Sequence, residues 1–85
     1  MNPVIMNLKI QLASEEKRYF ELKIKAKRLF SEILEMANPY FSDDQIDLIK
    51  AEEIKQAASE LCVVKTDLSS CIQNIKKLKV DIGDE

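Results

Sequence analysis

Residues 54–82 read IKQAASELCVVKTDLSSCIQNIKKLKVDI, and this segment has the most regular apolar spacing in the chain. Its apolar side chains recur at steps that alternate between three and four residues without a break. They are Ile54, Ala57, Leu61, Val64, Leu68, Cys71, Ile75, Leu78 and Ile82. This is the heptad spacing of a helix that packs along one seam against another helix. The stretch therefore predicts a long amphipathic helix.

A second heptad pattern fills the first half of the chain. From residue 4 to residue 37 there is no glycine or proline, and apolar residues again recur at steps of three and four. They are Ile5, Leu8, Leu12, Tyr19, Leu22, Ala26, Leu29, Ile33 and Met36. Glu15 stands at one seam position, and an unpaired buried carboxylate costs several kcal/mol. We expect Glu15 to form a solvated defect or to turn toward Lys65.

The sequence Asn38-Pro39-Tyr40 separates the two periodic stretches. A residue before proline is disfavoured in the α conformation, and Asn tolerates a left-handed position at a helix end. Ser42 and Gln45 then have the spacing of a capping box.

These signals predict one all-α domain, a coiled-coil-like antiparallel hairpin spanning residues 1–85. Its first helix covers about 4–37, its loop 38–43 and its second helix about 44–82. Asp44 or Asp47 is an alternative cap for the second helix.

Charges beside the two seams predict how the helices align, because in an antiparallel pair the flanking residues of one seam meet those of the other. The expected ion pairs are Arg18 with Glu60 and Lys25 with Glu53. This register sets Leu12 opposite Cys71 and centres the hairpin between Phe41 and Ser42.

Helix 4–37 carries more apolar surface than one seam uses. A second stripe, about 150° around the helix from the first, would lie in water in a lone hairpin. It consists of Met6, Ile10, Ala13, Phe20, Ile24 and Leu34, interrupted by Lys17, Lys27 and Ser31. We expect this stripe to be an oligomer or partner interface. Tyr40 and Phe41 in the loop form a second candidate patch.

The simplest arrangement that covers the stripe is a homodimer forming a four-helix bundle. The alternatives are an unusually apolar monomer, or a subunit of a hetero-complex whose stripe docks on another helical protein. In each case we expect an interaction or scaffolding module.

Composition argues against catalysis and cofactors. The 85 residues include no histidine and a single glycine, and the formal net charge is −2. A His-containing zinc site, a His-dependent triad and a glycine-rich phosphate loop are therefore all missing. We expect no enzymatic activity, no metal, no cofactor and no small-molecule substrate.

Nucleic-acid binding is a weaker alternative, as an accessory protein using Lys17, Lys23, Lys27 and Arg28. Such binding needs positive charge gathered on one face, and on a helix these side chains spread around the axis. Acidic residues among them also argue against a helix lying on a membrane surface.

The two cysteines, Cys62 and Cys71, stand nine positions apart. On one helix this separation is about 13 Å, too far for a disulfide. The sequence also shows no secretory signal and no stretch apolar enough to span a membrane. We therefore expect an intracellular, cytoplasmic protein with reduced cysteines.

The long charged helix, the Asn-Pro-Tyr break at 38–40 and the Ile-Asp-Leu-Ile sequence at 46–49 form a pattern that spans most of the chain. It resembles small, mostly uncharacterised helical-hairpin proteins encoded by bacteriophages and prophages. The resemblance implies a phage or bacterial interaction protein and transfers no site residues.

Overall fold

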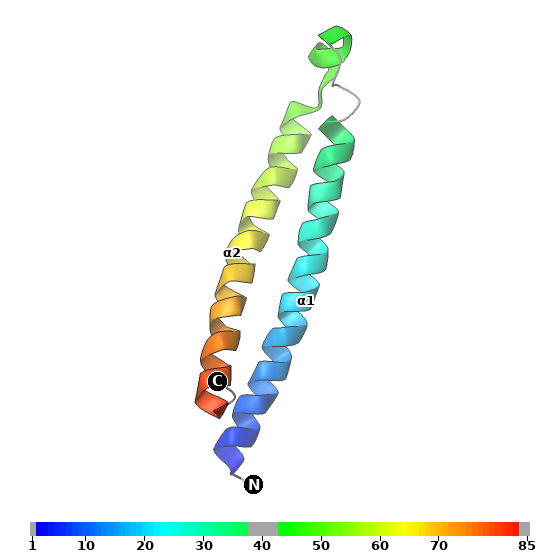
Figure 1. The fold of residues 1–85 in the computed structure, drawn as a ribbon. Helices are drawn as coiled ribbons and strands as arrows, with labels where there is room; N and C mark the ends of the chain where they lie inside the picture. Colours follow the sequence, from blue (N-terminus) through cyan, green and yellow to red (C-terminus); the bar gives the residue numbers. More distant parts are fainter. Residues whose placement is uncertain (1, 38–42, 84–85) are drawn as a thin grey trace.

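The chain forms two long helices joined at one end, seen here in a computed structural model that describes residues 2–37 and 43–83. Helix α1 covers Pro3–Ala37, a 3₁₀ helix covers Asp43–Leu48, and α2 covers Ala51–Ile82. The long helices lie side by side and run in opposite directions, so α1 begins where α2 ends (Figure 1). The molecule is a rod with extents of 67 × 18 × 14 Å. The predicted all-α helical hairpin is confirmed.

The first turn of α1 is held by the residue before it. The Oδ1 atom of Asn2 accepts a hydrogen bond from the Val4 N–H at 2.9 Å, and the Asn2 carbonyl accepts one from Met6 at 3.1 Å. Pro3 fits the first helical position because it has no N–H to leave unpaired there. Asn2 therefore caps α1, which starts one residue before the expected position.

The second helix begins later than the sequence pattern predicts. Residues 43–48 form the 3₁₀ helix, and α2 starts at Ala51, after Lys50, whose side chain makes no capping hydrogen bond. The expected start near residue 44 is therefore wrong by seven residues. The first seam residue of α2 is Ile54, so the segment before it has no heptad contact to support it, and helices depend on such packing. The proposed cap Ser42 lies outside the described residues.

Gly83 ends α2 as its position in the sequence indicates. Its φ of 94° lies in the left-handed region, and its N–H donates to the carbonyls of Lys79 and Val80, each at 3.0 Å. These bonds satisfy carbonyls that a helix end otherwise leaves unpaired.

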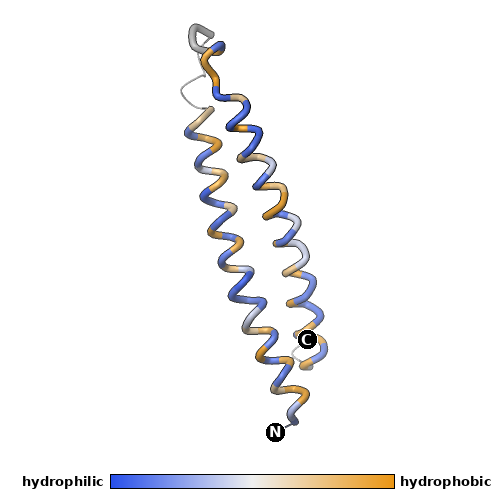
Figure 2. The backbone as a smooth tube through the Cα atoms, turned by 180° about the vertical axis from the view of Figure 1, so that it is seen from behind, coloured by the Kyte–Doolittle hydropathy of each residue, from blue (hydrophilic) through white to orange (hydrophobic). Residues whose placement is uncertain are grey.

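The core is the seam between the two helices. The buried residues among those described are Leu29 of α1 and a row of four on α2, spaced seven residues apart: Ala57, Val64, Cys71 and Leu78. Every other residue of the two predicted heptad series, Glu15 included, is partly buried. The heptad prediction is therefore confirmed. Figure 2 shows hydrophobic and hydrophilic residues interspersed along the length of both helices.

The register of the hairpin differs from the expected one. The Sγ atom of Cys71 lies 3.1 Å from the carbonyl oxygen of Glu15 and also faces the Tyr19 backbone, whereas the charges predicted that it would face Leu12. The thiol therefore lies three to seven residues further along α1 than predicted, a shift of one to two helical turns. The late start of α2 contributes, because it moves the centre of the hairpin toward the C-terminus.

The expected ion pairs across the hairpin are not formed. Within residues 2–37 and 43–83, the salt bridges join Arg18 to Glu15 and Arg28 to Glu32, both at 3.7 Å and both within α1. Glu60 is therefore not paired with Arg18, and Glu53 is not paired with Lys25. Exposed ion pairs contribute only about 0.2–1 kcal/mol each, and acids recur every seven residues on that flank of α2, so these pairs do not single out one register.

We predict that truncating the largest buried side chain will sharply destabilise the hairpin. Leu29→Ala removes a side chain that is 1% exposed and is expected to lower the free energy of unfolding by about 2–5 kcal/mol. Leu48→Ala, at a position 64% exposed, is the matched control and should change it by less than about 0.5 kcal/mol. Urea denaturation followed by circular dichroism measures both, and equal effects would contradict this core.

Candidate functional site

The most extensive candidate surface is the second apolar stripe of α1, which we call the outer face. It consists of Met6, Ile10, Ala13, Phe20, Ile24 and Leu34, all of which are exposed. Phe20 is 64% exposed and Ile10 61%. The structure thus leaves all six predicted interface residues uncovered within the hairpin.

The outer face repeats the heptad spacing of the seam. With Lys17, Lys27 and Ser31, which share its rows, it runs from Met6 to Leu34 at steps alternating between four and three residues. This row is about 42 Å long. Helix α1 therefore carries two heptad rows, and α2 covers one of them.

The apolar surface continues from the outer face onto the groove between the helices. Phe20 lines a hollow together with Tyr19 of α1 and with Ile72 and Ile75 of α2. Phe30, 55% exposed, follows Leu29 of the inner seam and widens the apolar surface of α1. Sequence reasoning missed Ile72, because it stands outside both heptad rows.

The far side of α2 has no comparable stripe. Serine, threonine and glutamine predominate there at exposed positions: Ser59, Thr66, Ser69, Ser70 and Gln73. Val63 and Val80 are exposed but stand 17 residues apart. The hairpin therefore has one broad apolar face, and it belongs to α1.

The basic residues of the nucleic-acid alternative lie in and beside the outer face, interspersed with apolar and acidic side chains. Lys17 and Lys27 stand within the outer face, and the Nζ atom of Lys23 lies 5.8 Å from the centre of the Tyr19 ring at the edge of the inner seam. Arg28 pairs with Glu32 at 3.7 Å. The four positive charges are thus separated by apolar residues and by acids such as Glu16 and Glu21, and they form no continuous basic patch.

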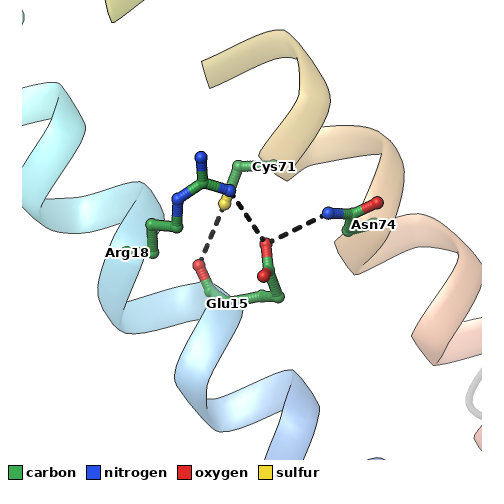
Figure 3. A network of polar contacts seen from close by, with 4 residues as sticks. All are labelled: Glu15, Arg18, Cys71 and Asn74. Atoms are coloured by element: carbon green, nitrogen blue, oxygen red, sulfur yellow. Dashed lines mark hydrogen bonds and ion pairs between the residues drawn. The ribbon is translucent and has the colours of Figure 1, made fainter. Parts of the chain in front are cut away.

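A polar network crosses the inner seam at Glu15 (Figure 3). The Oε2 atom of Glu15 accepts a hydrogen bond from the Nδ2 atom of Asn74 at 3.4 Å and lies 3.7 Å from Arg18. The Glu15 carbonyl accepts the bond from Cys71. The carboxylate therefore contacts Arg18 and Asn74, its side chain stays 24% exposed, and the expected turn toward Lys65 is wrong.

Asn74 is the exception in an acidic row on α2. The residues spaced seven apart along that flank are Glu53, Glu60, Asp67, Asn74 and Asp81. A slide of α2 by one heptad would bring Asp67 or Asp81 level with Glu15, placing two carboxylates together. The contact between Glu15 and Asn74 therefore favours the observed register over the neighbouring ones. The sequence did not predict a role for Asn74, because that role depends on which α1 residue lies opposite.

The two cysteines lie in different surroundings. Cys71 is fully buried, whereas Cys62 is exposed, and both are free thiols. Burial raises the pKa of the Cys71 thiol above its ordinary value, and the hydrogen bond to Glu15 and the negative charge of that residue raise it further. A thiol that stays protonated and inaccessible is a poor nucleophile and a poor metal ligand.

Carboxylates gather around a hollow near the loop end of the hairpin, lined in part by Glu32, Glu52, Glu53 and Glu60. Among the described residues, no three His, Cys, Asp or Glu side chains are arranged to hold a metal ion. Likewise, no helix in this part of the chain is both long and apolar enough to cross a membrane. The predicted loop patch, Tyr40 and Phe41, lies outside the described residues.

Comparison of the chain with protein-family models, with curated proteins and with solved structures found no match. The interpretation of the candidate surface therefore depends on the geometry and chemistry of the hairpin.

We predict that Asn74→Asp will destabilise the hairpin by about 1–2 kcal/mol, because it replaces a hydrogen bond to a carboxylate with a like-charge contact. Gln73→Asp makes the same change in charge at the neighbouring exposed position and is expected to have little effect. Urea unfolding at equal chain concentration compares the two variants. Equal loss in both would show that Asn74 has no special part in the register.

We also predict that the two thiols differ strongly in reactivity. Under native conditions at pH 8, a chromogenic disulfide reagent should modify Cys62 rapidly and Cys71 only at the rate at which the hairpin opens. In denaturant both should react rapidly. Cys62→Ser is the control and should abolish the fast native phase, whereas a fast phase that survives would contradict the burial of Cys71.

Proposed function

We propose that this protein is a non-enzymatic helical scaffolding module that associates with itself through the outer face of α1. The observation that carries the proposal is the exposure of that face, five of whose six residues are large hydrophobic side chains between 47% and 64% exposed. A row of large exposed apolar side chains along one face of a helix is typical of interaction sites.

The small core supports the same function. Among the described residues, the hairpin buries Leu29, Ala57, Val64, Cys71 and Leu78. Small single cores supply little stability beyond the entropy lost on folding, and small proteins commonly add stability by oligomerisation. Covering the outer face would bury further apolar area on the longest element of the fold.

The spacing of the outer face favours a helical partner. Its rows alternate between steps of four and three residues, which is the pattern that interlocks with another helix. The surface of a flat or β-sheet partner does not match that spacing. A helix with two heptad rows is expected at the centre of an assembly of several helices.

We predict that a charge placed in the outer face will separate the chains without unfolding them. Phe20→Lys should weaken association at least about thirtyfold, because it replaces an apolar side chain with a positive charge in a contact that already contains Lys17 and Lys27. Its helix content should persist because Phe20 is exposed in the hairpin. Val63→Lys, at a position 62% exposed on α2, is the matched control and should leave association unchanged. Sedimentation velocity over a concentration series, with circular dichroism, provides the measurements.

The proposal fails if the unmodified chain sediments as a monomer throughout the micromolar range. It fails equally if Val63→Lys and Phe20→Lys weaken association to the same extent, since the contact would then not be specific to the outer face.

A further inference from the structure

We propose that the second copy binds in the antiparallel direction, α1 against α1, with Phe20 near the twofold axis. This inference rests on the proposed function and specifies the orientation and register of the contact. The occupant is a second copy because the charges in and beside the outer face complement the same charges when one copy is reversed.

The lysines within the outer face distinguish the two directions. In a parallel pair, each of Lys17 and Lys27 meets its own equivalent inside the contact, and like charges there oppose association. In an antiparallel pair with Ala13 opposite Ile24, Lys17 lies opposite Phe20 and Lys27 opposite Ile10. Each lysine stem then covers an apolar side chain while its ammonium group reaches water.

The residues beside the outer face favour the same direction. Glu16 and Lys23 stand on one flank, seven positions apart, and both are exposed. Neither takes part in a salt bridge among the described residues of its own chain. The antiparallel register that sets Ala13 opposite Ile24 brings Glu16 of each copy level with Lys23 of the other, so symmetry forms this pair twice.

A parallel pair would place like charges together on the flanks as well. In parallel coiled coils each flanking residue meets the opposite flank of the partner five positions further along. Glu16 would then meet Glu21, and Lys23 would meet Arg28. The same sequence is therefore complementary to itself in one direction and repulsive in the other.

The resulting assembly is closed. The outer face lies about 150° around α1 from the seam that α2 fills, so the two α1 helices lie in the centre and the two α2 helices outside. The outward side of α2 is predominantly polar and offers no further heptad row. The two 3₁₀ helices, each with exposed Ile46 and Leu48, would then project from opposite ends of the assembly.

Charge reversal tests the direction. Glu16→Lys alone and Lys23→Glu alone should each weaken association on the order of tenfold, since each turns two attractive pairs into repulsive ones. The double variant Glu16→Lys/Lys23→Glu should restore the original affinity. A parallel pair predicts the opposite for Glu16→Lys, which would relieve repulsion by Glu21 and tighten association.

Disulfide trapping tests the register independently. In a Cys62→Ser background, the exposed positions Met6 and Ser31 are each changed to cysteine in separate proteins. The antiparallel register predicts that the mixture forms a disulfide between the two variants under mild oxidation, while neither variant alone links to itself. Linking of Met6→Cys to itself would show a parallel pair.

The outcomes separate this inference from the proposed function. A dimer that tightens with Glu16→Lys, or that links through position 6 alone, overturns the antiparallel arrangement and leaves self-association intact. A chain that is monomeric at micromolar concentration overturns self-association itself, and the antiparallel arrangement with it.

Discussion

The arrangement of the hairpin depends on the contact that Glu15 makes across the seam. A heptad row of apolar residues is nearly unchanged by a slide of seven positions, so packing alone leaves neighbouring registers close in energy. The Glu15 carboxylate removes this ambiguity, because it needs a donor and finds one in Asn74 at 3.4 Å. At the same flank position one heptad away in either direction stands an aspartate. A polar group inside the seam thus selects one alignment among several.

The seam also explains why the second heptad row of α1 remains exposed. On α2 the buried row includes small side chains such as Ala57 and Cys71, and α1 contributes only Leu29 to the fully buried set among the described residues. Two straight helices can cover only one face of each other. Because α1 has two heptad rows and α2 has one, a single hairpin leaves the second row of α1 exposed.

Much of this fold follows from the sequence, and the part that does not has a definite cause. The heptad steps placed both seams correctly, and Gly83 marked the end of α2, because helix packing and left-handed caps depend on local spacing and residue type. The register was wrong because Glu53, Glu60 and Asp67 recur every seven residues, so a slide of one heptad still sets an acid beside each base. The start of α2 was wrong because residues 43–48 have capping residues but no seam residue to hold an α-helix in place.

The exposed outer face was likewise predictable from the sequence, whereas the role of Asn74 was not. Surplus apolar residues on one helix are visible directly in the heptad pattern. The role of an asparagine on the partner helix depends on which side chain lies opposite, and that depends on the register. Glu15, Cys71 and Asn74 therefore come together only in the folded hairpin, and no local spacing in the chain predicts their contact.

In the inner row of α1, and by our proposal in the outer row, charged residues favour one of several packings that the apolar residues alone would leave nearly equal in energy. In the inner seam, Glu15 interrupts the row and distinguishes alignments along the helix axis. In the outer row, Lys17 and Lys27 interrupt it, and in our proposal they distinguish the direction of the second copy. Each interruption gives up some apolar contact, and the packing that it interrupts gains a defined arrangement in exchange.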